Sequence, residues 1–115
     1  MKYFKKAEFA CPCCGKNLCD KPFMDKVDKA RSEAGVPFVI TSGYRCPDHN
    51  LRVGGKSDSS HPMGCACDIE AEDSRSRFLI IDGLIKAGFN RIGIGRKFIH
   101  ADDDINKDQE VVWLY

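Results

Sequence analysis

Two stretches of the chain carry apolar residues at the three- and four-residue spacing of an amphipathic helix. The first is expected to begin at Asp20, whose side chain can cap a helix, and to stop at Gly35. The second is expected to begin at Asp73 or Ser74 and to end at Gly88. The first is predicted to bury Phe23, Val27, Ala30 and Ala34, and the second Phe78, Ile81 and Ile85, with Leu84 beside them.

Short alternating or β-branched runs predict the strands of a sheet. We expect strands at residues 38–41, 65–71, 97–102 and 111–115, with residues 89–94 leading back to the sheet. One or two helical turns at residues 47–53 and a Gly/Ser-rich loop at 54–60 follow the first strand. The predicted fold class is α+β, a mainly antiparallel sheet with two helices packed on one face. The opposite face is then available to present functional groups.

Length and charge narrow the possible functions. A chain of 115 residues can bury one core, so residues 1–115 are expected to form a single domain. The net charge is +1 and charges of both signs are interspersed, which gives no indication of nucleic acid binding. No apolar run could span a bilayer, and the N-terminal residues lack the apolar core of an export signal. We therefore expect cytoplasmic synthesis without a signal peptide, and neither a membrane nor a nucleic acid partner.

The chain contains seven cysteines, an odd number that leaves at least one thiol unpaired and favours a reducing compartment. Several lie in a Cys-rich N-terminal segment, residues 1–19, which is expected to be irregular. Cys11 and Cys14 have the CxxC spacing of half a structural zinc site, for which only Cys19 and Cys46 offer further ligands. The alternative is that these thiols are free or packed. The two cysteines of the second predicted strand are expected to be small core residues.

Three residues form a candidate site for a catalytic zinc ion. Alternation in the second strand places Asp68 on the same face as Ala66, and alternation in the third places His100 on the same face as Asp102. With His61 from the preceding loop, these side chains would supply two imidazoles and one carboxylate. Zinc accepts such ligands, and three of them leave one position open for water.

The amino-acid sequences of these segments resemble the motifs of a known family. Residues 59–68 read SxHxxGxAxD, a motif similar to that of the Hedgehog/DD-peptidase group, the M15 zinc peptidases. The segments that resemble the third-ligand strand and the SGYR, N and GG motifs are residues 98–100, 41–45, 49–50 and 54–55. The matches occur in the family's order and span roughly residues 38–102. The resemblance implies a Hedgehog/DD-peptidase-like fold, a Zn²⁺ cofactor, and His61, Asp68 and His100 as the metal ligands.

The resemblance also implies catalytic roles for two further residues. Arg45 occupies the family position whose guanidinium contacts a substrate carbonyl or carboxylate, although a structural ion pair is the alternative. Asp102 is the nearest candidate for the general base, about 6 to 7 Å from His100 along the strand. Many relatives place this acid three residues before the last histidine, where this chain has Lys97. Asp102 could instead orient His100.

Other residues are expected around the cleft. Glu70 and Asp103 are further candidates for the base. Ser59 is expected to form a hydrogen bond near the first ligand and to contact substrate, and Tyr44 or Trp113 to form a wall of the cleft.

The favoured function is a zinc peptidase that hydrolyses peptidoglycan stem peptides. It could be a D-alanyl-D-alanine carboxypeptidase or an L-alanyl-D-glutamate endopeptidase. A short chain of this kind resembles a phage or prophage lysin that reaches the cell wall after release by a holin. The alternative is a non-catalytic module of the same fold that keeps zinc and serves for binding, as in Hedgehog signalling domains, or a structural component of a phage particle. Lys97, in place of the usual acid, favours the alternative.

Overall fold

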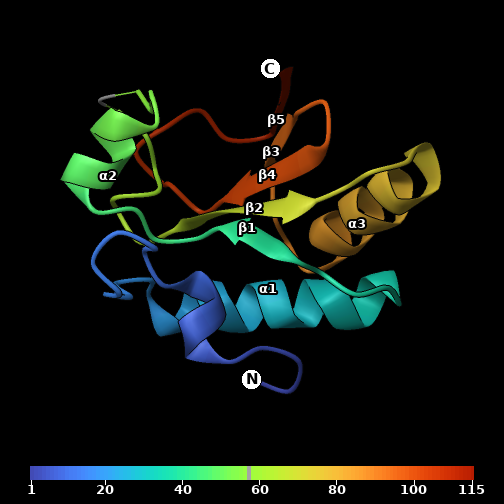
Figure 1. Ribbon diagram of the computed structural model, residues 1–115. Coiled ribbons are helices and arrows are strands. Elements are labelled where there is room, and N and C mark those ends of the chain that lie inside the picture. Colours follow the sequence, from blue (N-terminus) through green and yellow to red (C-terminus); the bar gives the residue numbers. More distant parts are fainter. Residues whose placement is uncertain (57) are drawn as a thin grey trace.

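The computed structural model of the protein describes residues 1–56 and 58–115 and is built around a five-stranded sheet (Figure 1). The strands lie in the order β1-β2-β4-β3-β5, and all neighbours are antiparallel except β3 and β5, which are parallel. Their bounds are β1 Ile40–Ser42, β2 Ala66–Glu70, β3 Arg91–Ile94, β4 Phe98–Asp102 and β5 Val111–Leu114. The predicted mainly antiparallel α+β fold is therefore confirmed, with one parallel pair at an edge.

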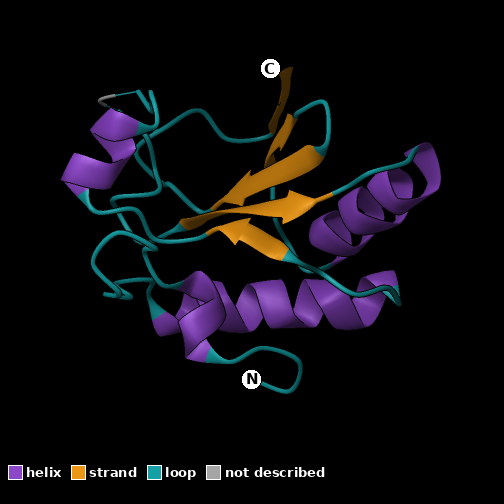
Figure 2. Ribbon diagram, viewed as in Figure 1, coloured by secondary structure: helices purple, strands orange, loops and turns teal. Residues whose placement is uncertain are grey.

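The helices fall into two groups (Figure 2). Two long helices, α1 (Lys21–Ala34) and α3 (Ser74–Lys86), pack together against one face of the sheet. The shorter elements are the 3₁₀ helix η1 (Lys6–Phe9) and α2 (Pro47–Arg52). No helix of residues 1–56 and 58–115 has the length and apolar character needed to cross a membrane.

Helix α1 begins and ends as its sequence predicts. The Asp20 carboxylate accepts a hydrogen bond of 2.7 Å from the Phe23 amide, which satisfies one of the unpaired donors at the helix start. Gly35 follows the last turn with a φ of 70°, a conformation that suits glycine.

Helix α3 buries a different face from the one predicted. Phe78 and Ile85 are 68% and 57% exposed, whereas Ile80 and Leu84 are buried, so the predicted core face was wrong for these positions. The cause is the contact between the two long helices at Gly83. A Cβ atom at this position would lie 2.5 Å from the Ala30 carbonyl oxygen of α1. The close approach turns the side of α3 that carries Gly83 inward.

The two faces of the sheet have different roles. One packs against the hydrophobic core, and the other carries the candidate metal ligands. Side chains on one face of β2 and β4 are buried beneath α1 and α3; they are Cys67, Ile69, Ile99 and Ala101. Because successive side chains of a strand point to opposite faces, Asp68 and His100 lie on the other face. Phe4 and Phe9 are buried and hold the N-terminal segment against the core.

Candidate metal centre

The three predicted ligands come together on the face of the sheet opposite α1 and α3. Asp68 of β2 and His100 of β4 are direct partners in the antiparallel register. His61 reaches them from the loop between α2 and β2. His61 Nε2 lies 3.4 Å and His100 Nδ1 lies 3.0 Å from the same oxygen of Asp68, Oδ1. One ligand atom of each residue lies within 4.8 Å of the other two, a spacing at which all three can bind one ion.

Hydrogen bonds fix which nitrogen of each histidine can bind a metal. His61 Nδ1 lies 2.7 Å from the Gly43 carbonyl oxygen, and His100 Nε2 lies 2.7 Å from Asp102 Oδ2. Both oxygens only accept hydrogen bonds, so these two nitrogens carry the ring protons. In the neutral rings, the other two nitrogens present lone pairs toward Asp68 Oδ1. Two lone pairs and a carboxylate oxygen are stable at this distance only with a cation among them, and this donor set fits Zn²⁺.

The neighbouring charged groups change the pKa values of His100 and Asp68. Burial lowers the pKa of His100, but the carboxylates of Asp102 and Asp68 outweigh this effect and raise it overall. Burial raises the pKa of Asp68, but hydrogen bonds from His100 and His61 hold it well below its usual range. In the metal-free protein, the two carboxylates therefore favour the protonated form of His100.

Asp102 lies where it orients His100, the second of the two roles considered for it from the sequence. Its side chain is 1% exposed, and Oδ2 accepts the hydrogen bond from His100 Nε2. Oδ1 accepts hydrogen bonds of 2.6 Å from Arg91 Nε and 3.1 Å from the Asp104 amide. A carboxylate with both oxygens occupied and almost no contact with solvent is poorly placed to take a proton from a water molecule.

Sequence analysis did not identify Arg91. This arginine of β3 is buried, and its guanidinium lies 5.0 Å from the Trp113 ring in addition to its contact with Asp102. It also donates a hydrogen bond to the Asp108 carbonyl oxygen. The only signal in the sequence is a positive charge inside an apolar strand. Burial raises the pKa of Asp102, but hydrogen bonds from His100 and Arg91 outweigh this effect and lower it overall.

A cleft of about 580 Å³ opens over the three ligands. Trp113 and Tyr115 form an aromatic wall, with ring centres 5.5 and 6.2 Å from that of His100. Tyr44, the other residue expected at this wall, is 4% exposed and does not line the cleft. It lies beyond the end of β1, in a segment that turns inward so that the Tyr44 amide donates a 2.8 Å hydrogen bond to the Phe9 carbonyl.

Two further predicted residues line the cleft. Ser59 Oγ accepts a 3.2 Å hydrogen bond from the amide of His61, which places it next to the first ligand as expected. Arg45 is half-buried, and burial lowers its pKa while the charges of Asp68 and Tyr115 oppose the change. Its Nε atom is buried and has no hydrogen-bond partner among the described residues. Because Arg45 lines the cleft, its guanidinium is suited to bind an oxygen of a ligand.

The carboxylates near the cleft differ in their availability. Glu70 and Asp103 do not line it, and Asp103 forms an ion pair of 2.8 Å with Lys26. The lining carboxylates of the described residues are Asp58, Asp68 and Asp102. Since Asp68 faces both histidines and Asp102 holds His100, Asp58 is the lining carboxylate not committed to the ligand set.

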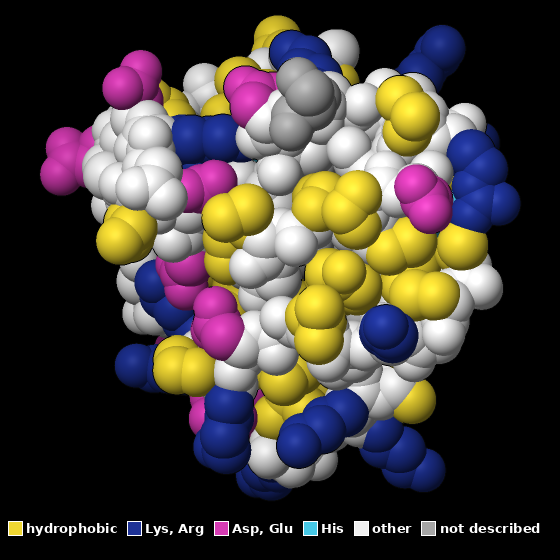
Figure 3. All heavy atoms as spheres, turned by 90° about the vertical axis from the view of Figure 1, so that its left-hand side faces the viewer, with side chains coloured by type: hydrophobic (Ala, Val, Ile, Leu, Met, Phe, Trp, Pro, Cys, Tyr) yellow, Lys and Arg dark blue, Asp and Glu magenta, His cyan; other side chains and the backbone are white. Residues whose placement is uncertain are grey.

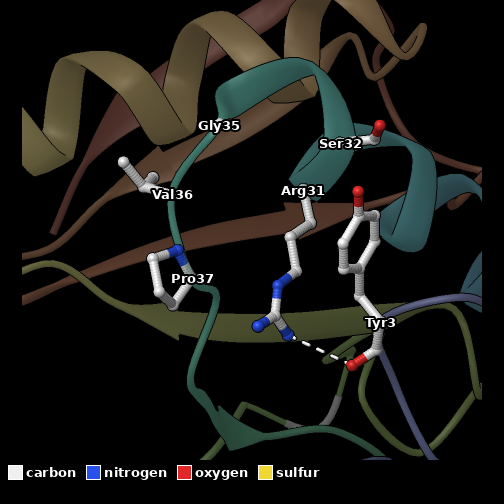
Figure 4. Close-up of a pocket in the computed structure, with 6 residues that line it drawn as sticks. All are labelled: Tyr3, Arg31, Ser32, Gly35, Val36 and Pro37. Carbon is white, nitrogen blue, oxygen red and sulfur yellow. Dashed lines mark hydrogen bonds between the residues drawn. The ribbon is translucent and has the colours of Figure 1, made fainter.

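A second, smaller hollow lies between the N-terminal segment and the end of α1 (Figure 4). Its volume is about 270 Å³, and it is lined by Tyr3, Arg31, Ser32, Gly35, Val36 and Pro37. Arg31 donates a 3.2 Å hydrogen bond to the Tyr3 carbonyl oxygen. None of these six residues is a carboxylate, an imidazole or a thiol, so the hollow lacks the usual side-chain ligands of a metal ion.

Cysteines form a second group of potential ligands. The thiols of Cys11, Cys14 and Cys46 lie within 4.8 Å of one another. Cys46 was one of the two further ligands considered from the sequence. The other, Cys19, is outside this group; it is buried in the core, and burial raises its pKa to about 11.

One of the comparisons with known proteins, that with models of protein families, agrees with the geometry of the site. A comparison with curated proteins gives no match. The sequence model described as peptidase M15 matches residues 2–102, a range that contains the three predicted ligands, Arg45 and Asp102. Because the match covers most of the chain, the protein belongs to the peptidase M15 family.

Proposed function

We propose that the protein is a zinc peptidase that hydrolyses stem peptides of peptidoglycan. M15 peptidases are zinc-dependent, and the His61, Asp68 and His100 side chains form a donor set that fits this ion. The observation that carries the proposal is the position of these three ligands at the base of a cleft that Arg45 also lines.

The residues of the cleft would divide the work of amide hydrolysis. When bound, zinc would supply Lewis acidity toward a carbonyl and would lower the pKa of a water molecule. Arg45 would bind a carboxylate or carbonyl oxygen of the substrate, and Arg91 and Asp102 would hold His100 in its ligating orientation. Asp58 is our candidate for the group that accepts a proton, because it lines the cleft and is not part of the ligand set.

The charge of the cleft supports an acidic peptide as substrate. Four cationic side chains, Arg45, Lys56, Arg91 and Lys107, line it against three carboxylates, Asp58, Asp68 and Asp102, and aromatic side chains form part of its wall. Stem peptides carry free carboxylates, which cationic side chains attract. Both a D-alanyl-D-alanine carboxypeptidase and an L-alanyl-D-glutamate endopeptidase meet this requirement. The role of a phage or prophage lysin, with release by a holin, is part of the same proposal.

A non-catalytic binding module is the second candidate. Two observations favour it: Lys97 replaces the acid found in many relatives, and Asp102 is fully occupied by His100 and Arg91. Such a module would keep zinc and the cleft but would lack an efficient base.

The test is to incubate the zinc-loaded protein with purified peptidoglycan and with a synthetic stem pentapeptide. Mass spectrometry would identify any released D-alanine or new amino group and hence the bond that is cut. His61→Ala is the control without a complete ligand set, and Asp58→Asn should keep zinc but turn over slowly. Zinc binding without turnover in the wild-type protein would contradict the proposal that it is a peptidase. Retention of that protein on peptidoglycan would then support the proposal of a binding module.

A further inference from the structure

The Cys-rich N-terminal segment and the loop after β1 meet at a cluster of thiols. Cys11 and Cys14 come from the first segment and Cys46 from the second, and their sulfur atoms lie within 4.8 Å of one another. The exposed thiol of Cys13 is close enough to Cys46 for the two to interact electrostatically, and it accepts a hydrogen bond from the Arg52 guanidinium. Figure 3 shows the side of the molecule that carries α2, where apolar side chains, with cysteine in the same colour, gather among lysines and arginines. This cluster is separate from the His61, Asp68 and His100 site.

A tight turn brings Cys11 and Cys14 together. The Gly15 amide donates a 2.8 Å hydrogen bond to the Cys11 carbonyl, and the Cys11 amide donates one of 2.8 Å to the Lys16 carbonyl. Gly15 has a φ of 73°, which lets the chain reverse immediately after Cys14. The turn directs both side chains toward Cys46, whose amide donates a 3.5 Å hydrogen bond to Cys11 Sγ. The geometry is that of a CxxC half-site facing a ligand from a distant segment.

The electrostatics of the cluster favour a thiolate. Burial raises the pKa of Cys11, but the amides of Cys46, Cys14 and Cys13 donate to its sulfur and lower the pKa to about 6. The Lys16 amide lowers the pKa of Cys14, but burial and the negative charge on Cys11 outweigh it and raise that pKa overall. One thiolate is therefore stable in the cluster, and a second needs a cation between them.

A disulfide uses only two of these sulfurs. Three thiols within 4.8 Å of one another instead suit a tetrahedral thiolate site, whose fourth position takes a further ligand. We propose that Cys11, Cys14 and Cys46 bind a second Zn²⁺ ion, with the fourth position directed toward Cys13.

This second ion would stabilise the loop that supports the first metal site. Cys46 directly follows Arg45, and the Gly43 carbonyl in the same loop accepts the hydrogen bond from His61 Nδ1. The N-terminal segment packs tightly behind this loop, because a Cβ at Gly43 would lie 2.6 Å from the Phe9 carbonyl oxygen. A zinc ion joining Cys11 and Cys14 to Cys46 would fix the segment that orients His61 and presents Arg45 to the cleft.

The experiment measures metal content and ligand type, so its result does not depend on the proposed peptidase activity. Protein purified under reducing conditions should contain two zinc ions per chain by mass spectrometry of the metal. His61→Ala and the double variant Cys11→Ser with Cys14→Ser should each retain one. The matched control is Cys65→Ser, because the Cys65 thiol lies outside the cluster and its pKa is raised to about 12 by burial. This variant should retain two ions.

Replacement of zinc by Co²⁺ identifies the ligands of each ion. Thiolate ligands give an intense sulfur-to-cobalt charge-transfer absorption in the near ultraviolet, which histidine and carboxylate ligands do not give. The band should be present in the wild-type protein and in His61→Ala but absent from the double cysteine variant. If that variant does not fold, titration of the wild-type protein with an organomercurial should release one zinc ion and leave the other bound.

The proposal is overturned by a single zinc ion that is lost in His61→Ala. It is equally overturned by a Co²⁺ spectrum without the charge-transfer band, or by a disulfide between Cys11 or Cys14 and Cys46 in the protein purified under reducing conditions.

Discussion

Replacement of Asp102 by asparagine distinguishes a residue that orients His100 from a general base. The carboxylate accepts hydrogen bonds from His100 Nε2 at 2.7 Å, Arg91 Nε at 2.6 Å and the Asp104 amide at 3.1 Å. An asparagine side chain has the same shape but presents an NH₂ group on one side. In either orientation, that NH₂ group meets a donor.

The two orientations have different consequences. If the NH₂ group faces His100, the imidazole must move its proton from Nε2 to Nδ1, the atom that faces Asp68 and would bind the metal. If it faces Arg91, a buried guanidinium loses its acceptor and its counter-charge, which is costly at 7% exposure. The first orientation is therefore favoured. The expected loss of zinc affinity is about 10- to 100-fold, as for other hydrogen-bond partners of metal ligands, or about 1.4–2.8 kcal/mol.

The assay is competition for Zn²⁺ against a chromophoric chelator, with circular dichroism to verify that the variant is folded. Asp103→Asn is the matched control, because the carboxylate of Asp103 pairs with Lys26 and does not line the cleft. It should bind zinc as the wild-type protein does. If Asp102→Asn keeps wild-type zinc affinity and loses only turnover, Asp102 acts as the base and our reasoning on its role fails.

Three further predictions concern substrate binding, packing and pH. Arg45→Lys should raise KM for a peptide with a free carboxylate about tenfold, the effect of losing one charged hydrogen bond, and should leave zinc content unchanged; an unaltered KM in a steady-state assay would contradict a role in binding. Gly83→Ala should lower the free energy of unfolding by about 1–3 kcal/mol in urea denaturation, because the added methyl group overpacks the contact between α1 and α3, whereas Ile85→Ala on the exposed side of α3 should change it by less than about 0.5 kcal/mol. The raised pKa of His100 stabilises the metal-free protein at low pH, and this contribution is lost as pH rises through that pKa. Zn²⁺ competes with the same proton, so the difference in Tm between zinc-loaded and zinc-free protein should widen as pH rises, and a constant difference in calorimetry would refute this coupling.

The alternation of side chains along a strand predicted the positions of two of the three metal ligands. The two-residue period of a strand placed Asp68 and His100 on definite faces, and the observed register makes them direct neighbours. The position of His61 relied on the resemblance to the M15 motif, because a loop has no period from which a direction can be inferred. The strands themselves were predicted within a few residues, since their apolar runs are short and bounded by turns.

The sequence was least informative where a tertiary contact decides between two local possibilities. Sharing a strand face with His100 suits both roles considered for Asp102, and the presence of Arg91 on the neighbouring strand favours the orienting role. Tyr44 lies after the end of β1, where alternation no longer applies, so its direction depends on packing against the N-terminal segment. The buried face of α3 follows from the close approach at Gly83, and helical spacing alone could not predict which of its apolar sides would meet α1.

The balance of charge at the site explains why buried ionic groups are tolerated there. The guanidinium of Arg91 and the carboxylate of Asp102 compensate each other at 2.6 Å beneath His100. The half-buried Arg45 is one of the positive side chains that line the cleft with Asp68, and the two charges interact. A divalent cation at Asp68 would make the cleft more positive beside Arg45. The same carboxylate that holds the ion thus leaves a field that attracts the acidic group of a substrate, and metal binding and substrate recognition become parts of one electrostatic arrangement.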